Sequence, residues 1–167
     1  MINPAFVVTM ARYNIWQNKS LLEAADQLDD AARKADRGSF FGSIHGTFSH
    51  LLWGDRMWMS RLAGHPPPSA GSIGESASMI EDWTTLREER NAIDVAIAEW
   101  AESLQETDMD EDLTWFSGAT GAEVTKPVAL LVTHMFNHQT HHRGQIHAML
   151  TAAGVRPGAT DLFIMPD

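Results

Sequence analysis

The chain has 167 residues, of which 44% are hydrophobic and 20% are charged, as expected for one soluble globular domain covering residues 1–167. Twelve basic residues stand against 22 acidic ones, and the formal net charge of -10 disfavours binding to a nucleic-acid backbone. No stretch approaches the ~18 consecutive apolar residues that a membrane span requires, and Pro4 interrupts the short apolar run near the N-terminus. We therefore expect a cytoplasmic protein without a cleaved signal and without membrane contact.

Two helices are predicted in the N-terminal part of the chain. Asn3 and Pro4, a capping residue followed by a proline at the first helical position, start a helix that continues to about Lys34. A second helix, capped by Ser43, ends near residues 63–64, just before three consecutive prolines. Apolar residues recur with the helical period in both segments, which predicts one buried face on each helix.

Two further helices are predicted in the rest of the chain. The third covers roughly residues 76–104, and the fourth starts at residues 125–127 and stops at Gly154. Between residues 107 and 126 the helical period is lost around a Gly-rich centre, which predicts a short hairpin. The tail after Gly154 is expected to form a turn or a short helix. Long helices joined by modest loops predict an all-α fold, namely a four-helix bundle with a short hairpin between its third and fourth helices.

Several polar side chains on these helices need an interpretation. Asn14 and Gln17 interrupt the apolar face of the first helix, so either this helix rotates there or its N-terminal half faces a polar group, such as a wall opposite a bound ligand. Asp55 and Glu23 are expected to be solvated acids. Arg143 is expected to point away from the buried face of the fourth helix and to serve at the surface or at an interface.

Five of the eight histidines lie within fourteen consecutive residues, on the fourth helix. Two of them, His138 and His142, occupy positions of a buried face with 3-4 spacing, which comprises Val128, Leu131, Met135, His138, His142, Gln145, Met149 and Ala152. Burying polar groups without a partner costs roughly 2–7 kcal/mol each by transfer estimates. Two imidazoles one helical turn apart can bind one metal ion, which is the simplest partner.

A third ligand must come from another helix, and His50 is the best placed donor, near the middle of the second helix. The chain has no cysteine, so nitrogen and oxygen ligands favour zinc, nickel, iron or manganese. Gln145, one turn beyond His142, is a candidate to contact a metal-bound species, or it is a packing amide. His134 is either a supporting group or a packing residue. The remaining histidines are expected to lie outside the site, with His65 exposed in the proline loop: His45, His65, His141 and His147.

Three segments of the chain resemble the DinB family in the same order. They are residues 13–22 (YNIWQNKSLL), 43–62 (SIHGTFSHLLWGDRMWMSRL) and 137–147 (NHQTHHRGQIH). The resemblance implies a DinB/YfiT-like four-helix bundle that is commonly dimeric. It also implies a divalent metal, bound by one histidine of the second helix and by the H-x-x-x-H pair that precedes R-G-Q. In this chain these ligands would be His50, His138 and His142.

Three histidine ligands would leave a coordination position open for water or for a thiolate. The resemblance implies an enzyme that uses zinc or nickel to hydrolyse a small molecule or to transfer a low-molecular-weight thiol onto an electrophile. The alternative is a non-catalytic binding or interaction module that the metal stabilises and that acts in a stress response. An open coordination position would favour the enzyme, whereas a fourth protein ligand would favour the module.

Overall fold

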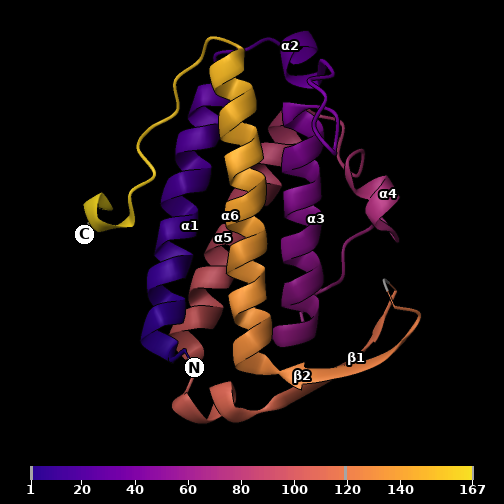
Figure 1. The fold of residues 1–167 in the computed structure, drawn as a ribbon, viewed down its shortest axis with the longest axis vertical. Helices are drawn as coiled ribbons and strands as arrows, with labels where there is room; N and C mark the ends of the chain where they lie inside the picture. The colour runs from indigo at the N-terminus through magenta and orange to yellow at the C-terminus, as the bar shows by residue number, and fades with distance from the viewer. Residues whose placement is uncertain (1, 119, 167) are drawn as a thin grey trace.

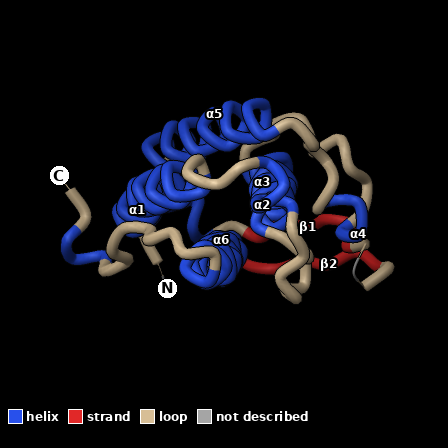
Figure 2. Tube along the Cα trace, turned by 90° about the horizontal axis from the view of Figure 1, so that it is seen from above, coloured by secondary structure: helices blue, strands red, loops and turns tan. Residues whose placement is uncertain are grey.

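The computed structural model describes residues 2–118 and 120–166, and most of these residues are helical. Four long helices lie side by side (Figure 1), and in the view from above α1 and α3 lie between α5 and α6 (Figure 2). Each of α1 and α3 packs against both α5 and α6, so the four enclose one apolar core. Their bounds are Pro4–Ala25 for α1, Ile44–Leu62 for α3, Trp83–Ser103 for α5 and Val128–Ala152 for α6.

The first predicted helix is shorter than expected. It ends at Ala25, and a separate short helix, α2 (Asp30–Lys34), follows after a turn. Asp29 caps α2, because its Oδ1 accepts a hydrogen bond of 2.7 Å from the backbone N–H of Ala32. This cap supplies an acceptor to a helix start, where backbone N–H groups lack partners. The prediction of one continuous helix to Lys34 was therefore wrong at this break.

The third predicted helix also begins later than expected. Asp82 caps α5 by accepting a 2.8 Å hydrogen bond from the backbone N–H of Thr85, so the helix starts at Trp83 rather than near Ser76. Ser76 instead ends the short helix α4 (Ile73–Ser76), which lies against α3. The capped start of α3 at Ser43 agrees with the prediction.

A two-stranded antiparallel sheet interrupts the helical architecture, as the predicted hairpin required. Strands β1 (Asp112–Ser117) and β2 (Ala122–Pro127) pair with Asp112 opposite Pro127. The all-α class is thus incomplete, and residues 125–127 belong to β2 rather than to the start of the last helix. A short 3-10 helix, η1 (Glu106–Asp110), precedes the hairpin. A second one, η2 (Leu162–Ile164), lies in the C-terminal tail. Within the described residues, no helix combines the length and the apolar run needed to span a bilayer.

A buried ionic group lies inside the core. Arg90 is fully buried, and its guanidinium contacts Asp55 and Asp94 at N–O distances of 2.6 Å each. Asn14 and Asn18 of α1 donate hydrogen bonds of 2.8 and 2.9 Å to Oδ1 of Asp94. The expectation of a solvated Asp55 was therefore wrong. Asn14 does face polar partners, as one of the alternatives predicted, but these are the buried ionic group and not a bound ligand.

The buried ionic group also contacts α6. Gln139 donates a 3.0 Å hydrogen bond to Asp55 Oδ1, and Arg143 donates to Asn14 Oδ1. Arg143 is only 5% exposed, which contradicts its predicted surface role. It lies inside because α6 packs against both α1 and α3 and so buries a wider face than one 3-4 stripe. Gln17, by contrast, faces the C-terminal tail and donates to the carbonyl of Ala159.

Candidate metal centre

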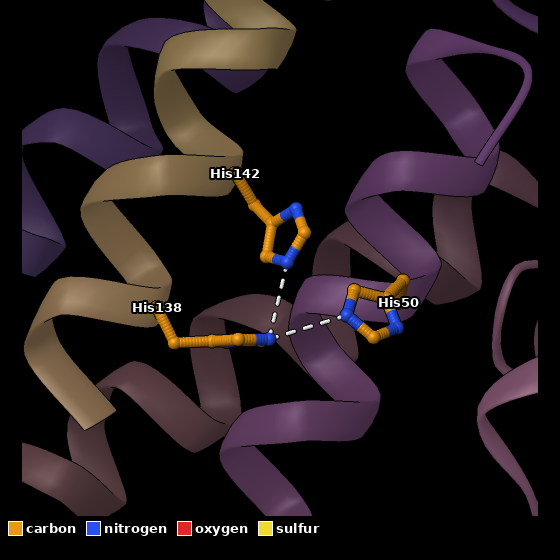
Figure 3. Close-up of side chains that lie close together, drawn as sticks. All are labelled: His50, His138 and His142. Atoms are coloured by element: carbon orange, nitrogen blue, oxygen red, sulfur yellow. Dashed lines mark hydrogen bonds between the residues drawn. The ribbon is translucent and has the colours of Figure 1, made fainter. Parts of the chain in front are cut away.

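Three imidazoles from two neighbouring helices meet at one point. His50 comes from α3, whereas His138 and His142 come from successive turns of α6 (Figure 3). The Nε2 atom of His138 lies 3.2 Å from Nε2 of His50 and 3.1 Å from Nε2 of His142. Nitrogens bound to one tetrahedral zinc at 2.0–2.1 Å would be about 3.3 Å apart. The three ligand atoms, all within 4.8 Å of one another, are therefore spaced to hold a metal ion.

The other ring nitrogen of His50 is held by α4. Its Nδ1 lies 2.8 Å from the hydroxyl of Ser76, and that hydroxyl donates its own hydrogen to the carbonyl of Ile73 at 2.6 Å. Because the hydroxyl hydrogen is engaged, the Ser76 oxygen accepts from His50 and places the proton on Nδ1. The Nε2 atom of His50 then presents a lone pair to the centre.

His142 is oriented in the same way from within α6. Its Nδ1 donates to the side-chain oxygen of Gln145 at 2.8 Å, while the amide nitrogen of Gln145 lies 3.2 Å from Nε2 of His141. Gln145, predicted as a candidate contact to a metal-bound species, is instead placed to fix a ligand ring. Such supporting hydrogen bonds set the tautomer and the direction of ligating histidines.

His138 differs from the other two ligands, because no hydrogen bond with a described residue orients its ring through Nδ1. Its Nδ1 is buried and has no partner among the described residues. The ring lies over Gly54 of α3, where a Cβ would come within 2.8 Å of His138 Cε1. One N–H at His138 Nε2 could satisfy only one of the two lone pairs that face it from His50 and His142. A cation in the middle would satisfy all three nitrogens, so the donor set fits a metal ion.

Burial keeps these imidazoles neutral. It lowers the pKa of His50 to about 3, with a smaller contribution from the neighbouring His142. It also lowers the pKa of His138 to about 3, together with the repulsion of the surrounding imidazoles. The pKa of His142 is lowered mainly by burial, against the hydrogen bond to Gln145. Neutral imidazole is the form that binds metals, so the site is ready to bind at pH 7.

Aromatic rings cover the His50 side of the centre. Phe41 stacks on the His50 ring at a centroid distance of 3.7 Å, and Trp53 stacks on it at 5.7 Å. Phe41 could not be predicted from the sequence, because it precedes the helix and carries no periodic signal. Ser76 was missed for a similar reason, since it lies in a four-residue helix.

The remaining histidines lie outside the cluster. His45 is buried, and its Nε2 lies 2.7 Å from the carbonyl oxygen of Ile80. His134 is exposed and packs edge-on against Trp58 at 5.2 Å. His65 is half-buried rather than exposed.

Comparisons with known proteins bear on the fold and the family of the chain. The sequence model of the DinB family matches residues 1–167. Protein DinB of Bacillus subtilis (strain 168) is 24% identical over 159 residues, which cover 93% of this chain and 91% of that protein. The crystal structure of a DinB-like protein from Bacillus cereus ATCC 10987 has a similar fold, with a TM-score of 0.63 and 16% identity over 86% of this chain and 90% of that one. On the strength of the match over its whole length, the chain belongs to the DinB family.

Proposed function

We propose that this protein is a metal-dependent enzyme whose divalent ion is bound by His50, His138 and His142. The observation that carries the proposal is the convergence of three neutral imidazole nitrogens, to which no other histidine or carboxylate of the described residues is added. Asp55, the acid next to Gly54, is engaged by Arg90 and Gln139 instead. Such a three-ligand set leaves a position for substrate, which is typical of catalytic rather than structural zinc sites.

A bound ion would supply Lewis acidity, which activates a coordinated water or thiol at neutral pH. The protein contributes the geometry. Ser76 and Gln145 hold two ligand rings by their Nδ1 atoms, and Gly54 lets the third ring approach α3. Phe41 and Trp53 exclude water from the His50 side.

We propose hydrolysis of a small molecule, or transfer of a low-molecular-weight thiol onto an electrophile, as the reaction class. Zinc and nickel suit an all-imidazole set best, and iron and manganese are further candidates. We keep the cytoplasm as the proposed location, and a homodimer built from DinB/YfiT-like four-helix bundles as the proposed assembly. The net charge of -10 supports a small-molecule substrate over a nucleic acid.

The second candidate is a metal-stabilised, non-catalytic module that acts in a stress response. One observation favours it: the site joins α3 to α6, so a bound ion would cross-link two of the four long helices. The two proposals differ in what loss of the metal does, since only the enzyme loses turnover.

The test is elemental analysis of the purified protein, followed by turnover screens with a thiol plus an electrophile and with hydrolysable esters and amides. We expect about one metal ion per chain, and we expect His138→Ala to lose both metal and turnover. His147→Ala is the matched control, because His147 lies on the same helix but outside the cluster, and it should keep both. Metal loss in His138→Ala with no turnover in the native protein would favour the non-catalytic module. Full metal content in His138→Ala would contradict both proposals.

A further inference from the structure

Arg61, near the end of α3, has an unusual environment. Its guanidinium carbon lies 4.9 Å from the ring centroid of Trp58 and 5.6 Å from that of Trp115 on β1. The side chain is half-buried, and burial lowers its pKa. No carboxylate of the described residues lies within ion-pair distance, whereas its neighbour Arg56 pairs with Glu89. Two indole rings, tilted 69° to each other, flank this partly desolvated guanidinium. Without a counter-ion among the described residues, it is free to receive an anion.

This guanidinium lies on the same side of α3 as the metal centre. Arg61 follows His50 by eleven positions, which is three full helical turns plus about 20°. The two side chains therefore leave α3 in nearly the same direction. Gly54, which contacts the His138 ring, lies between them and adds no side chain to this face. Seven residues from Gly54 to Arg61 correspond to about 10 Å along the helix. Figure 1 shows the hairpin across this end of α3 and α6, where β1 contacts α3.

A row of aromatic rings connects the metal centre to Arg61. The Trp58 ring lies 5.2 Å from His134, and His134 lies 6.1 Å from His138. His134 is exposed and His138 is only partly buried, so this flank of the centre is accessible to solvent. The opposite flank, at His50, is covered by Phe41. A ligand that approaches the metal from the open flank would therefore extend along this row towards Arg61.

We infer that Arg61, with Trp58 and Trp115 as its platform, is a subsite for a carboxylate of the ligand that reaches the three histidines. The inference rests on the proposed function, because one ligand occupies both places. The planar fork of an arginine matches a carboxylate in two parallel hydrogen bonds. The substrate class is therefore a small molecule with a metal-binding group and a carboxylate about 10 Å apart, the length of an extended tripeptide.

The test uses four N-acetylated tripeptides and zinc-loaded protein, with dissociation constants measured by calorimetry. The peptides are Cys-Gly-Gly and Ser-Gly-Gly, each with a free C-terminal carboxylate or a C-terminal amide. Exchange of cysteine for serine removes the thiol for the metal, and exchange of the acid for the amide removes the charge for Arg61. We expect the Cys acid to bind about tenfold tighter than the Cys amide, as typical of one charge-assisted hydrogen-bonded pair.

The variant Arg61→Gln should reduce this acid-to-amide ratio to about one while it keeps its zinc content. Arg61→Lys, which keeps the charge but not the fork, should give an intermediate ratio and guards against misfolding of the first variant. Arg156→Gln is the control of equal charge, since Arg156 is exposed after α6, and it should keep the tenfold ratio. A ratio of one in the wild type, or a ratio that survives in Arg61→Gln, would overturn the inference.

The two proposals fail in different ways. Equal binding of Cys and Ser acids with a preserved acid-to-amide ratio would refute thiol binding at the histidines and leave the Arg61 subsite standing. Tighter binding of both Cys peptides than of both Ser peptides, without a preference for the acid, would support thiol binding at the histidines and refute the Arg61 subsite. Absence of binding by all four peptides would overturn the subsite and the thiol-transfer proposal together.

Discussion

Gly54→Ala tests the packing of the metal centre with a single methyl group. The added Cβ would lie 2.8 Å from Cε1 and 3.3 Å from Nδ1 of His138. Unstrained carbon contacts are about 3.5–4.0 Å, so the ring must move by roughly 0.7–1.2 Å. Without metal this movement is cheap, because His138 is only partly buried and can turn. With metal bound, the ring cannot move without losing its bond, since zinc–nitrogen bonds are ~2.0–2.1 Å long.

The cost should therefore appear in metal affinity rather than in the stability of the metal-free fold. Overpacking of this kind costs about 1–3 kcal/mol, which corresponds to a roughly 5- to 160-fold weaker metal complex. Alanine in place of glycine inside a helix contributes about 0.5–1 kcal/mol of stability, so the metal-free variant should unfold at a similar or slightly higher denaturant concentration. Zinc affinity is measured by competition with a chromophoric chelator, and stability by urea unfolding after chelation.

Gly144→Ala is the matched control. Gly144 lies on α6 two residues after His142, and a Cβ there would meet no atom within 4 Å. This variant should gain a few tenths to 1 kcal/mol of stability and bind zinc as the wild type does. Unchanged zinc affinity in Gly54→Ala would refute the account, because His138 could then not bind the metal from its position over α3.

Three further predictions concern the surroundings of the centre. Ser76→Ala removes the acceptor of His50 Nδ1 and should weaken zinc binding about 10–100-fold. The control is Ser78→Ala, at an exposed position, which should not change the zinc affinity. Equal zinc affinities of the two variants would contradict the role of Ser76. Arg90→Met leaves two buried carboxylates unpaired and should cost about 3–5 kcal/mol in urea unfolding, and a loss below about 1 kcal/mol would show that the ion pairs contribute little. The metal-free protein should lose stability as pH falls below 6.5, because the unfolded chain takes up protons that His50 and His138, each with a folded-state pKa of about 3, do not accept. Each of these two histidines contributes up to about 1.4 kcal/mol per pH unit, and unfolding midpoints that stay constant between pH 7 and 5 would contradict this sign.

The long helices could be predicted because their apolar period and capping residues are local properties. Their ends were less certain, since the aspartates at the caps of α2 and α5 differ in no local respect from other exposed acids. The predicted first helix was broken where Asp29 starts a new helix. Only the path of the chain around the four long helices decides whether such a residue caps a helix or is merely solvated.

The three histidines could be predicted to meet because each lies on a buried helical face and tolerates burial only with a partner. The groups that hold them could not. Ser76 reaches His50 from a four-residue helix that has no periodic pattern, and Gly54 matters through a side chain that it lacks. The prediction of a surface position for Arg143 is wrong because one 3-4 stripe covers only part of the buried face of α6. Gln139 and Arg143 are four residues apart, and this helical spacing is the sequence feature that indicates a second buried stripe on α6.

The most direct test of the metal centre is crystal diffraction from zinc-loaded protein at wavelengths on both sides of the zinc absorption edge. We expect one anomalous peak per chain, at about 2.0–2.1 Å from the Nε2 atoms of His50, His138 and His142, with no fourth protein side chain bound. A peak elsewhere on the protein would contradict this expectation, and so would a peak that misses any of the three nitrogens or is completed by a fourth side chain.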